Sequence, residues 1–290
     1  MVDVPSRKLN TENRNRYRCK YHHGNDSGTA MKMLLACLLL IATGHVYARD
    51  VEQNPGIDRL FNQAGITGTF VLYDVSAARF IVHDQPRAEQ RFIPASTFKV
   101  ANSLIGLATG VVASVDEVLP YGGKPQPVKA WEQDMGLREA IKISNVPVYQ
   151  ELARRIGLNR MRENLALIPY GNADTGAEVD TFWLKGPLEI SAIEQTEFLA
   201  RLAQDGLPYD TSVQQSVREI LQLDTGDGWV LFGKTGWTST PVPDLGWWVG
   251  WVVRDGRIFS FALNIDMPDQ SYVPKRVELG KACLKALGIL

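Results

Sequence analysis

The stretch PASTFKVA, residues 94–101, is the point from which the rest of the chain can be interpreted, because it reads as a turn that runs into an apolar helix. Ser96 and Lys99 are three residues apart, so on a helix they project from the same face, one turn from each other. A serine hydroxyl is a weak nucleophile that needs a base beside it. A lysine amine can be that base once its pKa is lowered or the amine is chemically altered. Patterns this short recur by chance, so the interpretation needs support from other parts of the chain.

The composition is that of an ordinary globular protein. The chain has 290 residues, of which 45% are hydrophobic and 22% charged, enough for one large domain or two coupled ones. The formal net charge is -1, and no basic stripe or aromatic platform interrupts the sequence. We therefore expect no nucleic-acid partner.

The N-terminal part of the sequence predicts export. Residues 1–30 are polar and basic, whereas residues 34–42 form an uncharged apolar run that follows Lys32 and precedes small residues ending at Ala48. This order is typical of a secretory signal peptide at 31–48, with Met31 as an alternative start to Met1. The apolar run is short for a bilayer span, so we expect no stable membrane anchor after cleavage. An uncleaved anchor with a basic arm is the alternative.

Cysteine and histidine counts exclude several catalytic classes. Once residues 1–48 are removed, Cys283 is the single cysteine and His83 the single histidine. No internal disulfide can form. A Ser-His-Asp hydrolase needs a histidine in the right place, and one histidine with one cysteine is too few for a zinc site. We therefore expect no metal, and a base that is neither histidine nor a zinc-bound hydroxide.

The apolar periodicity predicts strands at both ends of the chain and helices between them. Strand-like stretches are 68–75, 79–84, 229–234, 246–254 and 257–266, and Asp255-Gly256 is a hairpin signal between the last two. Helical stretches are 49–65, 96–109, 137–145, 147–156, 161–167, 191–205, 212–223 and 274–287.

This order predicts an α/β (α+β) fold with one antiparallel sheet, built from both chain ends, flanked by helices and carrying an inserted helical lobe. We divide the chain into an extension with signal peptide at 1–48 and one domain at 49–290. The sheet lobe covers about 49–90 and 228–290, and the helical lobe about 91–227. The cleft between the lobes is the expected site.

Other motifs follow the Ser96 stretch at intervals. Lys234-Thr235-Gly236 ends a predicted strand, where lysine and threonine can hold a carboxylate and a glycine lets a ligand approach closely. Ser144-Asn145-Val146 lies at a helix junction, and Tyr170-Gly171-Asn172 lies in a loop, where we expect it mainly to support the cleft wall. We expect the tryptophans of 246–251 to pack the sheet.

Taken together, order and spacing resemble the class D (oxacillinase-type) serine β-lactamases. The set is S-x-x-K, then S-x-V, Y-G-N and K-T-G, with Phe182-Trp183-Leu184 and the stretch GWWVGW at 246–251 as further support. The resemblance covers essentially all of 49–290. It implies a β-lactamase/transpeptidase-like fold, a small-molecule β-lactam substrate and a periplasmic location, for a monomer or a homodimer.

The resemblance also implies catalytic roles. Ser96 would be acylated, and the backbone N–H groups of Ser96 and Trp237 would form the oxyanion hole. Lys99 would be N-carboxylated by carbon dioxide or bicarbonate, with no other cofactor, and Trp183 would donate its indole N–H to the carbamate. An apolar pocket would favour the neutral amine that this modification needs; we expect it to be formed by Phe98, Val146, Trp183 and Leu184.

The remaining roles concern the leaving group and the substrate carboxylate. Ser144 would relay a proton to the ring nitrogen with electrostatic support from Lys234. Thr235 and Gly236 would meet the substrate, and Val146 would line its site. Arg276 would hold the carboxylate with a bidentate fork, with the neighbouring Lys275 as a competitor. Trp131 either lines the cleft rim or packs in the core.

Two alternatives use the same serine. A penicillin-binding transpeptidase or carboxypeptidase would deacylate poorly, so its acyl-enzyme would persist. A β-lactam sensor would bind covalently and signal, but such sensors follow several transmembrane helices, whereas this chain has one short apolar run. The sequence leaves the spectrum of substrates open.

Overall fold

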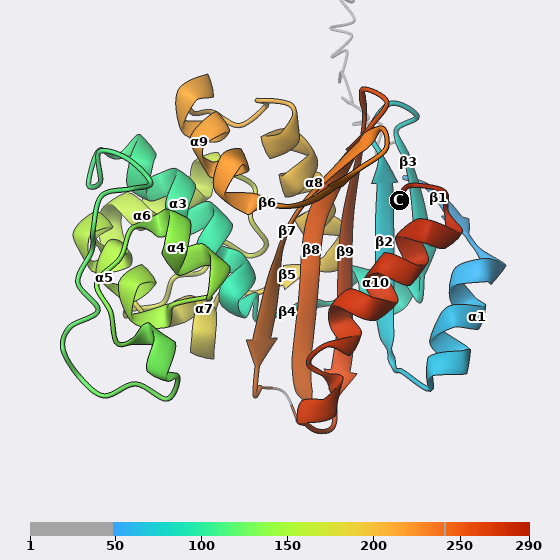
Figure 1. Cartoon of the computed structure of the whole chain (residues 1–290), viewed down its shortest axis with the longest axis horizontal. Helices are drawn as coiled ribbons and strands as arrows, with labels where there is room; N and C mark the ends of the chain where they lie inside the picture. Colours follow the sequence, from blue (N-terminus) through green and yellow to red (C-terminus); the bar gives the residue numbers. More distant parts are fainter. Residues whose placement is uncertain (1–48, 241) are drawn as a thin grey trace, which may run out of the picture. The chain divides into compact units, whose positions relative to one another are not determined.

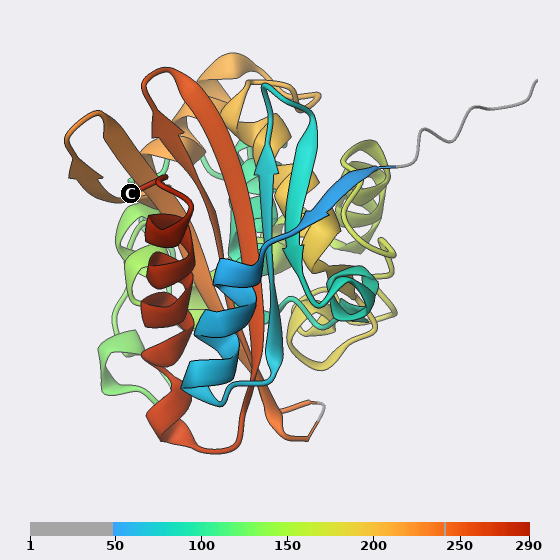
Figure 2. The same cartoon turned by 90° about the vertical axis from the view of Figure 1, so that its right-hand side faces the viewer.

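The computed structural model describes residues 49–240 and 242–290. The predicted signal peptide at 31–48 and the extension before it lie outside the described residues. In the described part, α1 (Pro55–Ala64) and α10 (Lys275–Ala286) cover one face of a central sheet, and α8 (Ala192–Ala203) packs on the other (Figures 1 and 2). Helices α3–α7 and α9 form a group beyond one edge of the sheet.

The sheet has seven strands among the described residues, in the order β1-β3-β2-β9-β8-β7-β6. All neighbours are antiparallel except β1 and β3, which are parallel. The strands are β1 (Asp50–Gln53), β2 (Gly68–Asp74), β3 (Arg79–His83), β6 (Gln222–Gly226), β7 (Trp229–Thr238), β8 (Asp244–Arg254) and β9 (Arg257–Met267). The predicted mixed fold, with an antiparallel-rich sheet built from both chain ends, is thereby confirmed.

The centre of the sheet follows directly from the sequence pattern. Arg254 pairs with Arg257, so Asp255-Gly256 makes the predicted hairpin turn between β8 and β9. All three tryptophans of β8 are buried, and they alternate between faces: Trp247 and Trp251 join the core shared with the helical group, whereas Trp248 joins the core under α1 and α10. Cys283 on α10 is fully buried in the second core, as expected.

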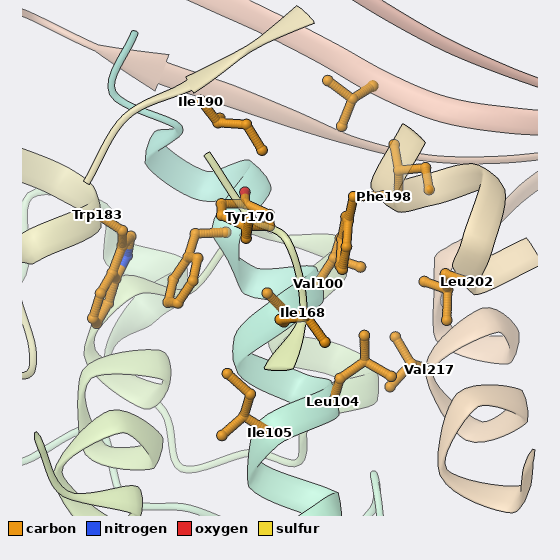
Figure 3. Packing of buried hydrophobic residues seen from close by; sticks show 14 of the residues in the cluster. Val100, Leu104, Ile105, Ile168, Tyr170, Trp183, Ile190, Phe198, Leu202 and Val217 are labelled. Carbon is orange, nitrogen blue, oxygen red and sulfur yellow. The ribbon is translucent and has the colours of Figure 1, made fainter. Parts of the chain in front are cut away.

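The helical group is organised around α3 (Lys99–Ala108), whose side chains are buried on nearly every face. Such a helix belongs in the interior rather than at a surface. Figure 3 shows Val100, Leu104 and Ile105 of α3 packed near Ile168 and Val217. The surrounding elements are α4 (Leu137–Lys142), α5 (Val146–Ile156), α6 (Leu158–Leu167), α7 (Phe182–Lys185) and α9 (Thr211–Leu221).

Short elements connect these parts. They are α2 (Gln85–Glu89), the two-stranded sheet of β4 (Arg91–Phe92) and β5 (Ile190–Ser191), and the 3-10 turns η1 (Ala95–Phe98), η2 (Lys129–Trp131) and η3 (Gln270–Tyr272). Within residues 49–240 and 242–290, no helix has the length and apolarity needed to cross a membrane.

Several boundary predictions were wrong. The strand expected over 229–234 continues as β7 to Thr238, so Lys234-Thr235-Gly236 lies within the strand and not at its end. Residues 50–53, expected in a helix over 49–65, form β1 instead, and Asn54 caps α1 by accepting from the amides of Gly56 and Ile57. The helix expected over 212–223 ends at Leu221, because the chain then turns into β6. Both strands lie at the edges of the sheet, and their largely exposed side chains leave little periodic signal in the sequence.

Another error concerns the helix expected over 137–145, although Ser144 does lie at the expected junction of two helices. The helix α4 ends at Lys142, and Ser144 lies in a loop with φ of 58°. This left-handed conformation is uncommon for a non-glycine residue and ends the helical hydrogen-bond pattern.

The packing of α10 on the sheet gives a stability prediction. A Cβ on Gly280 would lie 2.2 Å from Cε3 of Trp248, in the buried core. Alanine normally stabilises a helix interior by about 1 kcal/mol relative to glycine. Overpacking costs typically ~1–3 kcal/mol, so Gly280→Ala should lower the free energy of unfolding despite the better helix propensity. A urea titration measures the change.

The matched control is Lys285→Ala on the exposed side of the same helix, which should change the free energy of unfolding by less than about 0.5 kcal/mol. A Gly280→Ala protein more stable than the parent would contradict the close contact with Trp248.

Candidate active site

The chain around Ser96 forms η1, a short turn that leads directly into α3. Ala95 has φ of 49°, so the backbone turns sharply just before the serine. The amide and Oγ1 of Thr97 both donate to the carbonyl of Pro94, at 3.2 and 2.8 Å, and Gln195 Nε2 donates to Thr97 Oγ1 at 2.9 Å. These contacts fix the turn and leave Ser96 half-buried.

Lys99 faces Ser96 as the three-residue spacing predicts. Its Nζ donates to Ser96 Oγ at 2.8 Å, although the lysine side chain is fully buried. Burial removes water from the ammonium form and lowers the pKa of Lys99 well below its usual value, and the nearby charge of Lys234 lowers it further. Burial therefore favours the neutral amine, the form that can accept a proton, over the ammonium form.

One aromatic ring lies against the Lys99 amine, and two more lie in the same core. Phe98 and Trp183 are buried with ring centroids 5.4 Å apart, and the Tyr149 ring centroid lies 5.3 Å from Nζ. Val146 and Leu184, the other expected pocket residues, are half-buried. Tyr149 was missed by the sequence reasoning, although its position one turn after Val146, on a helix with an apolar face, is a signal that could have been used.

Trp183 carries a buried polar atom without a partner. Its side chain is fully buried on α7, and Nε1 makes no hydrogen bond with any described residue. Leaving such a donor unpaired costs about 1–3 kcal/mol.

Ser144 and Lys234 meet across the two lobes. Lys234 Nζ donates to Ser144 Oγ at 3.0 Å and to the carbonyl of Thr235 at 3.0 Å. Burial, with a contribution from the charge of Arg276, lowers the pKa of Lys234 from 10.5 to about 7. The pair can therefore exchange a proton near neutral pH.

The loop that holds Ser144 is braced from both sides. Asn145 caps α5 by accepting from the Val148 amide at 3.1 Å, and its Nδ2 donates to the carbonyl of Trp131 at 3.3 Å. Trp131 in turn donates its indole N–H to the carbonyl of Ile143 at 3.0 Å. Trp131 is half-buried and ties η2 to the serine loop, a positioning contact that neither of its two predicted roles included.

Strand β7 approaches the serine turn most closely at Gly236. A Cβ at this position would lie 3.0 Å from the carbonyl oxygen of Pro94 and 3.1 Å from Cγ2 of Thr97. The glycine thus allows β7 to pack closely against the protein's own turn at residues 94–97. The approach places the next residue, Trp237, beside the Ser96 turn.

Arg276 rather than Lys275 reaches the end of β7. Its guanidinium donates to the carbonyl of Gly236 and to the carbonyl of Val273, and its side chain is largely buried. Burial lowers the pKa of Arg276 to about 10, so it stays charged at neutral pH. Lys275 instead lies 3.6 Å from the centroid of the Tyr272 ring. Thr235, the residue before Gly236, is half-buried.

The Tyr170-Gly171-Asn172 motif is part of the scaffold, as expected. Tyr170 is buried edge-to-face against Phe98 at 5.5 Å, and Gly171 has φ of 57° with no space for a Cβ. Asn172 ties its loop to the strand before α8 by donating to Pro187 and accepting from the Glu189 amide. The motif therefore holds the wall behind Phe98.

Comparison with known proteins agrees with this geometry. The model of the penicillin-binding protein transpeptidase domain matches residues 68–284. The chain is 36% identical to beta-lactamase OXA-5 of Pseudomonas aeruginosa over 264 residues, which cover 90% of this chain and 99% of the relative. It is 37% identical to beta-lactamase OXA-48 of Klebsiella pneumoniae over 238 residues, covering 82% and 90%.

A solved structure shows the same fold. FUS-1 (OXA-85), a class D β-lactamase from Fusobacterium nucleatum subsp. polymorphum, superimposes with a TM-score of 0.80 at 41% identity, covering 82% of this chain and 100% of that one. The chain thus has a transpeptidase-type fold. Within that family it belongs to the class D β-lactamases, the serine hydrolases of the OXA type.

The lowered pKa of Lys234 predicts a pH-dependent stability. Between pH 7 and about 10.5 the unfolded chain binds a proton at this lysine that the folded chain does not, so the folded state gains stability as pH rises through this window. The free energy of unfolding, compared with that of Lys234→Met, should increase by about 1–4 kcal/mol from pH 7 to pH 10.

The comparison requires denaturant titrations of both proteins at each pH. Lys142→Met, which removes an exposed lysine, is the control and should show a nearly constant difference. A difference for Lys234→Met that stays flat over the window would mean that Lys234 is charged in the folded protein.

Proposed function

We propose that this chain is a β-lactamase that hydrolyses the amide bond of penicillins and related β-lactams through an acyl-enzyme on Ser96. The observation that carries the proposal is the fully buried Lys99 amine, whose pKa is lowered well below its usual value and which lies 2.8 Å from Ser96 Oγ. A neutral base in hydrogen-bond reach of a serine is what nucleophilic attack requires. The printed names of the relatives agree with this substrate class.

Acylation follows from the arrangement of these groups. Ser96 Oγ attacks the lactam carbonyl and its proton passes to the base on Lys99, while the backbone N–H groups of Ser96 and Trp237 receive the oxyanion. The carbon–nitrogen bond of the ring then breaks. Ser144 donates its hydroxyl proton to the ring nitrogen, and Lys234, 3.0 Å away, replaces that proton. Arg276 and Thr235 hold the ring carboxylate, and Gly236 and Val146 line the site.

N-carboxylation of Lys99 would complete the base. A neutral amine takes up carbon dioxide and loses a proton, which gives a carbamate that can accept a proton from Ser96 and later from the hydrolytic water. The site fits this group in two respects. The amine is kept neutral by burial, and the unpaired Trp183 N–H supplies a donor for the new negative charge. Phe98 and Tyr149 keep bulk water from the amine.

The same residues favour hydrolysis over a long-lived acyl-enzyme. A transpeptidase or sensor needs only the acylation step, whereas deacylation needs a base that stays in place after Ser96 is esterified. Lys99 lies one turn from Ser96 at the start of α3 and is fully buried, so its position does not depend on the free serine hydroxyl.

Export forms part of the proposal. The pattern over residues 31–48 supports secretion to the periplasm followed by cleavage after Ala48. The enzyme would act there on diffusing small molecules, as a monomer or a homodimer.

The proposal is tested by turnover of a chromogenic cephalosporin, using protein without residues 1–48. Rates are measured in degassed buffer and again with added bicarbonate. We expect many turnovers per enzyme and a rate that rises with bicarbonate, because the carbamate forms reversibly. One stoichiometric burst in both buffers would overturn the hydrolase assignment and leave a transpeptidase or a sensor.

A second prediction concerns the indole of Trp183. Trp183→Phe keeps an aromatic ring but removes the N–H donor, so the carbamate loses a charge-assisted hydrogen bond worth about 1.5–3 kcal/mol. The bicarbonate concentration needed for half-maximal activity should rise by at least tenfold, with activity restored at high bicarbonate. Trp131→Phe, which alters a tryptophan outside the Lys99 pocket, should leave that concentration unchanged. An unaltered bicarbonate dependence in Trp183→Phe would exclude the indole as a partner of the base.

A further inference from the structure

An exposed tryptophan and a carboxylate without a salt bridge meet where β7 ends and β8 begins. Trp237 is 43% exposed, unusual for its size, and its Nε1 donates to Asp244 Oδ2 at 2.6 Å. Asp244 begins β8, on the strand opposite Trp237, and is half-buried. No lysine, arginine or histidine among residues 49–240 and 242–290 forms a salt bridge with it, although this end of the sheet carries Lys234 and Arg276.

The strand register places these side chains on one face of the sheet. Trp237 is directly opposite Gly246, and directly opposed residues in an antiparallel pair project to the same side. A Cβ on Gly246 would lie 2.5 Å from Cδ of Arg276, so the arginine stem fills the space beside Trp237. Asp244 is two residues from Gly246 and shares this face. Thr235, two residues before Trp237, shares it as well.

These side chains therefore form a row on one face of the sheet, with the expected carboxylate-binding groups at one end and the anionic Asp244 at the other. Arg276 and Thr235 would hold the ring carboxylate, and Trp237 separates them from Asp244. Figure 1 shows that the β7–β8 connection and the start of α10 lie at the same end of the sheet. A substituent on the ring carbon next to the carboxylate-bearing carbon lies close to the carboxylate by covalent geometry, so it falls within reach of this wall.

We propose that Trp237 and Asp244 form a cation-selective wall, which favours β-lactams that carry a positively charged substituent beside the ring carboxylate. The inference rests on the proposed function and adds a substrate class to it. A cation over the indole face is attracted by the ring quadrupole. The N–H···carboxylate bond orients the ring and increases the electron density of its face, and the second oxygen of Asp244 adds a direct charge contact.

The test uses two cephalosporins that share a thienylacetyl side chain. One carries a pyridiniomethyl group at C3 and the other an acetoxymethyl group. The measured quantity is the ratio of kcat/KM for the cationic compound to kcat/KM for the neutral one. Asp244→Asn removes the charge but keeps an oxygen acceptor, and we expect the ratio to fall about three- to tenfold, mostly through KM. Asp244→Glu should retain the parent ratio.

Controls separate this effect from general electrostatics and from misfolding. Asp227→Asn makes the same charge change in the turn at the other end of β7 and should leave the ratio unchanged. Trp237→Phe keeps the backbone N–H but weakens the aromatic contact, so it should also lower the ratio. Trp237→Phe therefore still tests the wall if thermal melting shows that Asp244→Asn is poorly folded.

The outcomes distinguish the two proposals. Parent protein that turns over neither cephalosporin overturns the proposed function. Turnover with a ratio that neither Asp244→Asn nor Trp237→Phe changes by more than about twofold overturns the cation-selective wall alone. Benzylpenicillin and its α-amino derivative differ by an ammonium on the acyl side chain. If Asp244→Asn changed the kcat/KM ratio of this penicillin pair instead of the ratio of the two cephalosporins, the placement of the wall on the carboxylate side of the substrate would be wrong.

Discussion

The burial of the Lys99 amine is the constraint on which the rest of the site depends. A lysine in water is charged at neutral pH, and holding it neutral there costs roughly 4–5 kcal/mol. The fold offsets this cost by burying the Lys99 side chain completely in the core around α3, where the Tyr149 ring centroid lies 5.3 Å from Nζ. The amine then lies 2.8 Å from Ser96 Oγ, and burial favours its neutral form over the cation. Because Lys99 can serve as the base in this position, Ser96 needs no histidine.

The sheet supplies the second half of the site. Strand β7 can approach η1 closely because Gly236 has no side chain, and this approach brings Lys234 to Ser144 across the lobes. The charge of Lys234 lowers the pKa of Lys99 further, so the two buried lysines are electrostatically coupled. Arg276 from the last helix anchors the end of the same strand. Elements from three distant parts of the chain therefore fix one small set of groups.

Local patterns in the sequence predict much of this arrangement. The three-residue spacing of Ser96 and Lys99, the Asp255-Gly256 hairpin and the sheet built from both chain ends are all recovered in the structure. Features that depend on long-range contacts were missed. Strands β1 and β6 are exposed edges without a periodic pattern, and the contact of Trp131 with the Ser144 loop joins segments twelve residues apart. The pairing of Trp237 with Asp244 likewise becomes visible only once the register of β7 and β8 is known.

The measurement that tests the account most directly is carbon-13 NMR of the protein equilibrated with labelled bicarbonate. A neutral, buried Lys99 should give one carbamate resonance, at one equivalent per chain, which vanishes in Lys99→Ala and exchanges slowly because the pocket is closed. The signal should disappear at acid pH together with activity. A parent protein that turns over substrate many times without any such resonance would contradict a carboxylated Lys99 as the base and require another proton acceptor for Ser96.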